Sequence, residues 1–363
     1  MRSCPPIVKR WWRAPEARGA SASGRSRRVG LPELRKDPVL GRWVIVDTQR
    51  VRRPVDYHMP RQARRPAPCP LCEGHEYETP PEVMAYRNGP DALPDTPGWR
   101  VRVVPSKFPA LRAAGELERR GHGLYDVVSG HGVHEIIVES PNHDVSLGAL
   151  PVEAVEEVLR AYRDRIAALK RDPRFRAVAV FRTHGAETGA HMAHPHSQLL
   201  ATPILPETVG EELLNARAYH DYRERCLFCD IAQQEADEGT RVVLSSERII
   251  AFTPFASRVP FETWILPRRH APAFERAPGE EIGELAQVLR RLLRRLDRTL
   301  QDPPFHLALH TAPFADADSS YYHWHLELLP RLAPRATSDL ASGLPVNPVP
   351  PEDAARFLRE AGD

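Results

Sequence analysis

Two histidines and a glutamine stand at alternate positions of one short segment, His194-Pro195-His196-Ser197-Gln198. On an extended backbone, side chains two residues apart point to the same side, so His194, His196 and Gln198 share one surface. A neutral imidazole is a nucleophile, and an ordinary pKa of about 6.5 keeps that form populated near neutral pH. The segment is therefore a candidate for accepting and releasing a phosphoryl or nucleotidyl group. The alternative is a set of polar residues on the solvated face of an edge strand.

Two Cys-x-x-Cys pairs offer a second kind of chemistry. Cys69 and Cys72 lie in RRPAPCPLCEGHE, and Cys226 and Cys229 lie in YRERCLFCDIA. This spacing is typical of zinc knuckles, whereas a redox pair normally opens a helix directly after a strand. Disulfides and unligated thiols are the alternatives. Metal binding favours a reducing compartment, so we expect a cytoplasmic protein.

Strands with alternating apolar residues must position these groups in the first half of the chain. Residues 42–49, 99–109 and 134–143 alternate as strands do, and the strands at 177–185 and 193–204 follow a helix predicted over 151–171. The last of these strands carries His196.

The second half repeats this order. Strands are expected at 241–254, 261–270, 306–314 and 321–332, around a helix at 279–300 with a leucine-rich apolar stripe. The repetition indicates an internal duplication with an α+β fold, in which helices pack on a mainly antiparallel sheet. We expect the boundary near residues 205–225, in a helix-like segment.

The composition bounds the class of protein. The 363 residues suffice for two domains, and 42% are hydrophobic, which is ample for buried cores. The 50 basic and 48 acidic residues nearly balance, which argues against nucleic-acid binding and against a membrane-surface role. No apolar run approaches 18 residues, so we expect no membrane span.

Residues 1–30 form a basic segment rich in glycine and serine. Such a segment cannot bury enough apolar surface to offset its ordering entropy. We expect a disordered tail or an over-extended start, with an organelle-targeting peptide as the alternative.

At this point the chain resembles the galactose-1-phosphate uridylyltransferase family, the two-repeat branch of the histidine-triad superfamily. The motifs that carry the resemblance occur in order from Leu34 onward. They include CPLCEGHEYETPPEV, SKFPAL, HEIIVESPNHDVSL, HPHSQLLATP, CLFCDIAQQE, LPRRHAPAFE, HTAPF and NPVPPEDAA. The resemblance implies tandem histidine-triad-like domains at residues 31–210 and 211–363.

It also implies a ping-pong mechanism in which His196 attacks the α-phosphorus of a nucleotide sugar. A sugar 1-phosphate leaves, and a second sugar 1-phosphate then collects the nucleotide from the histidine. Gln198 would donate its amide to the α-phosphate oxygens, with Ser197 and nearby backbone N–H groups assisting.

For the first metal site, the resemblance implies a structural zinc held by Cys69, Cys72, His143 and His194. Two cysteines and two histidines make a closed tetrahedral site. His134 is the competing fourth ligand.

For the second site, the resemblance implies Cys226, Cys229, His270 and His323. His325 and His310 are alternatives for the last ligand, and iron is an alternative metal.

Substrate-binding residues follow from the same resemblance. Arg50, Arg53, Lys107 and Phe108 would border the nucleotide, because arginine recognises phosphate in a bidentate manner and an aromatic ring packs on base or ribose. A solvated surface position is the alternative for each arginine.

The chain also differs from the usual family pattern. Ser106 and Thr183 stand where the family usually has asparagine, and His191 stands where it has serine. In residues 336–345 the segment that contacts the hexose is changed, and Asp339 would replace a glutamate. These differences leave the nucleotide and the acceptor open.

We therefore predict a zinc-containing enzyme that exchanges UMP between UDP-glucose and galactose 1-phosphate. The first alternative is an ADP-glucose-type or dinucleotide phosphorylase with inorganic phosphate as acceptor, and the second is a non-catalytic protein that binds zinc or nucleotides. The expected partners are a nucleotide sugar and a hexose 1-phosphate, without nucleic acid or membrane, and the resemblance suggests a homodimer.

Overall fold

The computed structural model describes residues 31–47, 52–57, 68–89, 92–189, 192–332 and 337–362. They belong to one compact unit, Leu31–Asp363. The predictions for residues 1–30, Arg50 and His191 lie outside the described residues.

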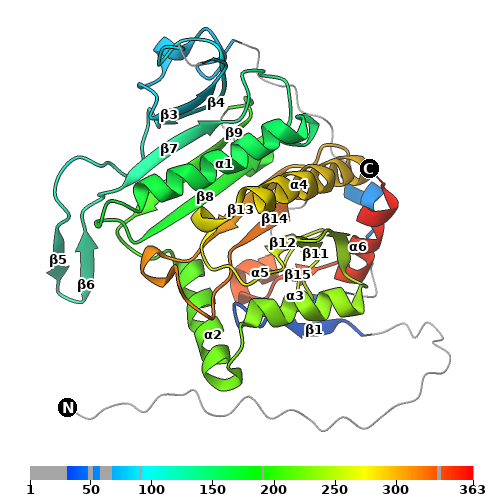
Figure 1. Ribbon diagram of the computed structural model, residues 1–363. Coiled ribbons are helices and arrows are strands. Elements are labelled where there is room, and N and C mark those ends of the chain that lie inside the picture. The colour runs from blue at the N-terminus through cyan, green and yellow to red at the C-terminus, as the bar shows by residue number, and fades with distance from the viewer. Residues whose placement is uncertain are drawn as a thin grey trace. The chain divides into compact units, whose positions relative to one another are not determined.

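A ten-stranded antiparallel sheet dominates this unit (Figure 1). Its strands run in the order β10-β11-β12-β14-β13-β8-β9-β7-β4-β3. The first-half strands are β3 (Met84–Arg87), β4 (Trp99–Pro105), β7 (Val133–Val138), β8 (Ala177–His184) and β9 (His196–Thr202). The second-half strands are β10 (Val242–Ser245), β11 (Ile249–Phe252), β12 (Thr263–Pro267), β13 (Phe305–His310) and β14 (His325–Pro330).

The two halves of the sheet meet at the antiparallel pair β8–β13, where Leu307 lies opposite Arg182. On either side of this seam the strands follow in corresponding order, so that β9 matches β14 and β7 matches β12. This is the arrangement expected of a tandem duplication, and the predicted α+β fold with helices on a mainly antiparallel sheet is confirmed.

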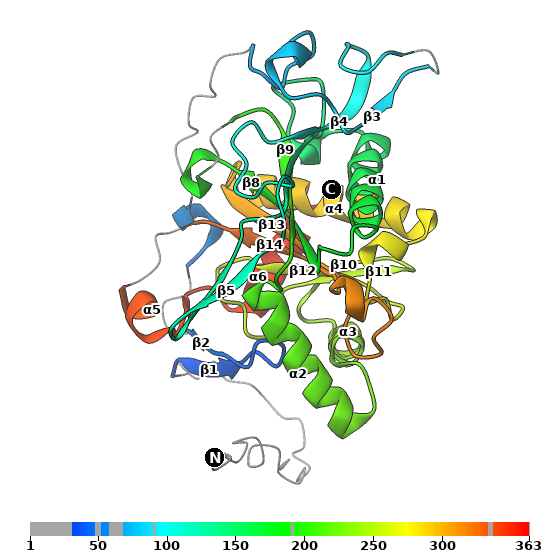
Figure 2. The same cartoon turned by 90° about the vertical axis from the view of Figure 1, so that its left-hand side faces the viewer.

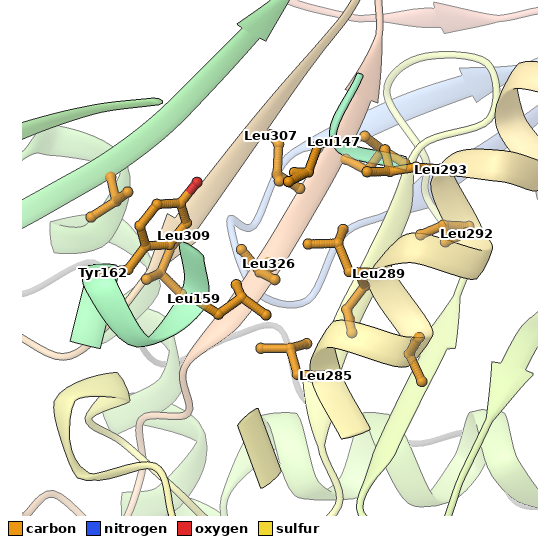
Figure 3. Packing of buried hydrophobic residues seen from close by; sticks show 14 of the residues in the cluster. Leu147, Leu159, Tyr162, Leu285, Leu289, Leu292, Leu293, Leu307, Leu309 and Leu326 are labelled. Atoms are coloured by element: carbon orange, nitrogen blue, oxygen red, sulfur yellow. The ribbon is translucent and has the colours of Figure 1, made fainter. Parts of the chain in front are cut away.

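One face of the sheet is covered by two long helices, α1 (Val152–Leu169) and α4 (Gly279–Leu300). Both match the helices predicted from apolar periodicity. The helices contact each other, and in Figure 2 both lie to the right of β8 and β9. Their apolar residues join one core cluster with strand residues of both halves. Figure 3 shows part of this cluster from close by, with leucines of α4 beside Leu307, Leu309 and Leu326.

The opposite face is covered differently in the two halves. Over the second half, α2 (Glu207–Arg223) and α3 (Leu227–Glu238) pack on β11 and β12. Strand alternation demonstrates this, since Ile249 belongs to the cluster below α4 whereas Ile250 belongs to the cluster with α2 and α3. Over the first half, the hydrophobic cluster that the described residues form on this face is small and contains strand residues and knuckle-loop residues.

Smaller elements complete the unit. A three-stranded sheet contains β1 (Glu33–Lys36), β2 (Trp43–Val46) and β15 (Val346–Asn347), so the strand predicted over 42–49 lies outside the large sheet. A hairpin of β5 (Arg119–His122) and β6 (Tyr125–Val128) stands apart from it in Figure 1. The remaining helices are α5 (Thr337–Ser342), α6 (Pro351–Glu360) and the 3-10 turns η1 (Pro54–Tyr57), η2 (Glu76–Glu78), η3 (Leu147–Ala149), η4 (Ala186–Thr188), η5 (Phe274–Arg276) and η6 (Phe314–Asp316).

Within the described part of the chain, no helix has the length and apolar character needed to cross a bilayer. The predicted boundary between residues 210 and 211 falls inside the first turns of α2, which leads from the first half to the second.

Candidate active site and metal centres

Strand β9 presents the candidate nucleophile. It pairs with β7 on one side and β8 on the other. Leu199 and Ala201 belong to the core cluster beneath the helices, so His196 and Gln198 point to the opposite face of the sheet. In the described part of the first half, no α-helix residue belongs to the hydrophobic cluster on that face, and His196 and Gln198 share one surface as predicted.

The imidazole of His196 is held by its own segment. Its Nδ1 donates to the main-chain carbonyl of His194 over 2.8 Å, which leaves Nε2 without a proton in the neutral ring. Only 5% of His196 is exposed, and this burial lowers its pKa below the ordinary value. The ring therefore stays neutral near pH 7 and keeps a lone pair on Nε2 for attack on an electrophile.

Gln198 lies two residues further along the same face. The Nε2 of His134 is 2.9 Å from the Oε1 of Gln198. His134 was the alternative ligand for the first metal, but in the structure its ring lies within hydrogen-bond distance of Gln198. No local sequence pattern links these two residues, which are 64 positions apart.

Ser197 points away from His196, into the helix-covered side. Its hydroxyl is fully buried, donates to Glu139 Oε1 over 2.5 Å and also contacts the hydroxyl of Tyr162 on α1. Arg182 forms a buried ion pair with Glu139 at 3.0 Å. The expectation that the Ser197 side chain assists at the phosphates is therefore corrected: adjacent strand residues face opposite sides, and this hydroxyl anchors β9 to α1 and β7.

The first predicted metal site is assembled as expected. Cys69, Cys72, His143 and His194 bring one ligand atom each within 4.8 Å of one another. The Sγ atoms of the two cysteines are 3.7 Å apart. His143 Nδ1 lies 3.4 Å from Cys72 Sγ, and His194 Nδ1 lies 3.6 Å from Cys69 Sγ.

These separations fit a tetrahedral zinc ion. Zn–S bonds of about 2.3 Å and Zn–N bonds of about 2.0 Å place neighbouring ligands about 3.3–3.8 Å apart in a tetrahedron. His194 donates from Nε2 to the carbonyl of Ser140 over 2.7 Å, which reserves Nδ1 for a metal. Burial lowers the pKa of His194 to about 4, so the ring is neutral, as a ligand must be.

The second predicted site has the same construction. Cys226, Cys229, His270 and His323 again bring their ligand atoms within 4.8 Å of one another. His270 Nδ1 and His323 Nδ1 lie 3.6 and 3.5 Å from Cys229 Sγ. Their Nε2 atoms donate to the carbonyls of Ser319 and Pro267, so both rings present Nδ1 to the centre.

His310 and His325, the alternatives for this site, lie in another group with Glu212 and Glu327. His310 Nδ1 donates to Glu212 Oε1 over 2.7 Å, and His325 Nε2 is 3.7 Å from the same oxygen. The ligand atoms of this group also lie within 4.8 Å of one another, so it could hold a cation. Glu327 already pairs with Arg258.

The remaining predicted substrate residues occupy loops and strand ends. Thr183 follows Arg182 on β8, so it lies on the same face as His196. Lys107 and Phe108 are exposed, and 84% of Phe108 is accessible. Arg53 is exposed beside Asp56.

The positions of two other predicted residues do not test their proposed roles in substrate binding. Ser106 accepts a hydrogen bond from the Phe108 N–H at 3.3 Å, and Asp339 lies in α5. No described contact joins Asp339 to His196. The roles of these residues remain predictions.

Sequence reasoning missed the groups that support these sites. On the helix-covered side of the sheet, β9 is anchored by a buried polar group of Glu139, Tyr162 and Arg182. In the second half, Glu212 pairs with His310. A charged residue within an otherwise apolar strand, such as Arg182 in AVAVFRTH, was the available signal. The sequence does not reveal which distant carboxylate forms an ion pair with this residue.

The chain matches family models over nearly its whole length. Residues 24–206 match the galactose-1-phosphate uridyl transferase N-terminal domain, and residues 212–338 match the C-terminal domain of the same family. With the duplicated antiparallel fold, this defines the class as a nucleotidyltransferase. The chain belongs to the galactose-1-phosphate uridyl transferase family.

Relatives with different named activities share this similarity. ADP-glucose phosphorylase from Arabidopsis thaliana is 33% identical over 337 residues, covering 91% of this chain and 93% of that protein. Galactose-1-phosphate uridylyltransferase from Thermotoga maritima is 28% identical over 341 residues, covering 91% and 98%. A crystal structure of the Arabidopsis phosphorylase with bound ADP-glucose has a TM-score of 0.75 at 31% identity, covering 91% of this chain and 98% of that chain.

Proposed function

We propose that this protein transfers a nucleoside monophosphate from a nucleotide sugar through a covalent intermediate on His196. The observation that carries the proposal is the geometry of this ring. Its Nδ1 donates to the His194 carbonyl at 2.8 Å, and burial keeps the ring neutral, so Nε2 is the nucleophilic atom.

In the first step the Nε2 lone pair of His196 attacks the α-phosphorus. A nitrogen–phosphorus bond forms while the bond from phosphorus to the bridging oxygen breaks, and sugar 1-phosphate leaves with that electron pair. The ring becomes positively charged, and its Nδ1–H donates more strongly to the carbonyl, which stabilises this charge.

In the second step a phosphate oxygen of the acceptor attacks the same phosphorus. The nitrogen–phosphorus bond breaks, its electrons return to His196, and a new nucleotide product leaves. Gln198 stabilises the charge on the non-bridging oxygens in both steps, because its amide group can donate to them from the same face.

Zinc fits both Cys₂His₂ groups and, when bound, supplies structural cross-links rather than an open position for substrate. His194 is the link between metal and chemistry within this chain. Its ring faces the first metal site while its carbonyl accepts from His196.

The proposed substrates are UDP-glucose and galactose 1-phosphate, with UMP exchanged between them. A second pair, ADP-glucose and inorganic phosphate, is favoured by a specific observation. The Arabidopsis ADP-glucose phosphorylase is 33% identical to this chain, against 28% for the Thermotoga uridylyltransferase. The same histidine serves both reactions, because only the donor base and the acceptor differ.

We assign the substrate contacts to the rim of this face. Thr183 is the neighbour of His196 on β8, and Lys107 and Phe108 stand exposed on the loop after β4. Arg50, Arg53, Ser106 and Asp339 complete the proposed set. A cytoplasmic location and a homodimer are also proposals, the first of which follows from reduced cysteine ligands.

Intact-mass spectrometry after separate incubation with UDP-glucose and ADP-glucose tests this function. A gain of one UMP or one AMP, mapped to His196 by peptide analysis, is expected, and the mass identifies the nucleotide. Discharge by galactose 1-phosphate or by phosphate then identifies the acceptor. If neither donor labels the protein, or if the label lies elsewhere, the proposal is wrong.

A further inference from the structure

We propose that His134 is a positioning residue that orients the Gln198 carboxamide and fixes the Ser106–Ala110 loop relative to it. The inference rests on the proposed function, because it concerns how Gln198 meets the phosphate. His134 lies on β7, where it is half-buried.

The register of β7 and β9 brings His134 and Gln198 together. His134 lies opposite Leu200, and Ile136 lies opposite Gln198. His134 and Gln198 are therefore diagonal neighbours on one face of the sheet, within reach of a long side chain. This is also the face of His196.

The hydrogen bonds of His134 determine the orientation of Gln198. The N–H of Ala110 donates to His134 Nδ1 over 3.2 Å, so Nδ1 carries no proton in this arrangement. The proton of the neutral ring is then on Nε2, which donates to Gln198 Oε1 over 2.9 Å. The amide oxygen is thereby engaged, and the NH₂ group is the part of Gln198 left to donate to a phosphate oxygen.

The same residue holds the loop at both of its ends. The N–H of Ser106 donates to the main-chain carbonyl of His134 over 2.8 Å, and the N–H of Ala110 donates to its ring. Between these two bonds stand the exposed Lys107 and Phe108. One residue thus sets the distance between the loop proposed to meet the nucleotide and the amide proposed to meet the α-phosphate.

Two substitutions separate these two roles. In His134→Asn the amide oxygen reaches about the position of Nδ1 and can accept from Ala110, but the side chain is too short to reach Gln198. In His134→Gln the amide nitrogen reaches about the position of Nε2 and can donate to Gln198 Oε1. The pair therefore distinguishes loss of the Gln198 contact from loss of the ring.

The experiment measures the rate of nucleotidyl-histidine formation by rapid quench and intact mass, with whichever donor labels the wild type. We expect His134→Asn to slow this step about tenfold at saturating donor, because a misplaced donor loses much of its effect on the transition state. We expect His134→Gln to stay within about threefold of the wild type. Melting temperature and metal content serve as folding controls.

The background variant Gln198→Ala tests whether His134 acts through Gln198. In that background His134→Asn should cause no further slowing, since coupled residues are not additive. An equal slowing in both backgrounds would overturn the inference, as would an unchanged rate in His134→Asn. If the wild type forms no adduct with either donor, the proposed function falls and this inference with it. An adduct with normal kinetics in His134→Asn removes the inference alone.

Should His134→Asn fail to fold, His134→Gln decides the matter by itself. It keeps the donor to Gln198 but lacks the rigid ring that also accepts from Ala110. A normal rate of adduct formation combined with a raised donor Kd supports the assignment, because the loop alone is then disturbed. A rate reduced as strongly as in Gln198→Ala contradicts it.

Discussion

Strands β9 and β14 occupy corresponding places on either side of the β8–β13 seam, and each begins at the second histidine of a His-x-His segment. In both, Nδ1 of the second histidine donates to the carbonyl of the first, over 2.8 Å for His196 and 3.1 Å for His325. In both, the first histidine faces a Cys₂His₂ group. The local geometry of the two repeats is therefore nearly the same.

The residues that pack on the second histidine differ between the two repeats. The ring of His325 packs between Phe228 of α3 and Trp264 of β12, with centroids 5.1 and 5.4 Å away. Its Nε2 is buried and has no hydrogen-bond partner among the described residues, and Glu212 Oε1 of α2 is 3.7 Å away. No described α-helix residue belongs to the cluster beside His196 on the corresponding face. The two repeats therefore share the local geometry of the imidazole but differ in what covers it, with His325 fully buried and His196 5% exposed.

The largest expected effect comes from removing each imidazole in turn. His196→Ala should reduce nucleotidyl transfer by on the order of 10⁴-fold or more, because the covalent step loses its nucleophile. His325→Ala should leave the rate of adduct formation within about threefold of the wild type. It should lower stability by about 2–4 kcal/mol, because it creates a buried cavity.

Adduct mass and urea unfolding measure these two outcomes. His325→Gln replaces the alanine variant if that variant does not fold. The assignment of His196 rather than His325 as the nucleophile is contradicted if the two histidine variants lose activity equally, or if the His196 variant keeps wild-type turnover.

The metal groups provide the next test. Cys69→Ser and Cys226→Ser should each lower the bound zinc by about one equivalent and lower the melting temperature, since structural metal binding is coupled to folding. Only Cys69→Ser should also slow adduct formation markedly in the protein that remains folded, because His194 connects the first site to His196.

Elemental analysis gives the metal content, and single-turnover labelling at a temperature well below both melting points gives the rate. Unchanged zinc in either variant contradicts the ligand assignment. An equal loss of rate in both cysteine variants contradicts the expectation that only the first metal site is linked to His196.

A smaller effect is expected from the helix that covers β14. Glu212 is completely buried and pairs with His310, and it also accepts from Tyr322 over 2.7 Å. Glu212→Gln should destabilise the protein by about 3 kcal/mol, because a buried imidazole loses its charged partner. Urea unfolding checks this value, and the rate of adduct formation per folded molecule should not change. A large loss of rate with normal stability would instead indicate that this site takes part in the chemistry.

The smallest effect concerns the reverse side of β9. Ser197→Ala should cost about 1–3 kcal/mol, because Glu139 and Tyr162 lose a buried partner. Its KM for the nucleotide sugar should stay within about twofold of the wild type, as the hydroxyl faces away from the substrate side. Steady-state kinetics and thermal unfolding decide the matter, and Thr183→Ala is the matched control on the substrate side. A KM raised more by Ser197→Ala than by Thr183→Ala would contradict the placement.

Much of the fold could be predicted because its periodic signals are local. The apolar stripe over 279–300 became α4 with the same ends, and the strand with His196 was expected within three residues of its start. Both Cys₂His₂ groups were predicted in full. They depend on segment motifs whose partners are fixed by the family resemblance rather than by spacing alone.

Other features were beyond the reach of the sequence because they depend on register and on distant partners. Ser197 was expected to assist at the phosphates, although alternation from His196 places its side chain on the helix-covered side of the strand. His134 was considered as a zinc ligand, yet the pairing of β7 with β9 brings its ring to Gln198. The hairpin β5–β6 was not expected at all.

The sequence by itself determined the chemistry available to this protein: an imidazole beside an amide, two sets of sulfur and nitrogen ligands, and two similar halves. These features depend on side-chain types and short-range periodicity, which do not require any tertiary contact. Only the tertiary structure decided which of the two corresponding histidines is packed under helices. That choice depends on α2 and α3 packing over one half of a shared sheet, and such packing joins residues too far apart in the chain for any local pattern to reveal.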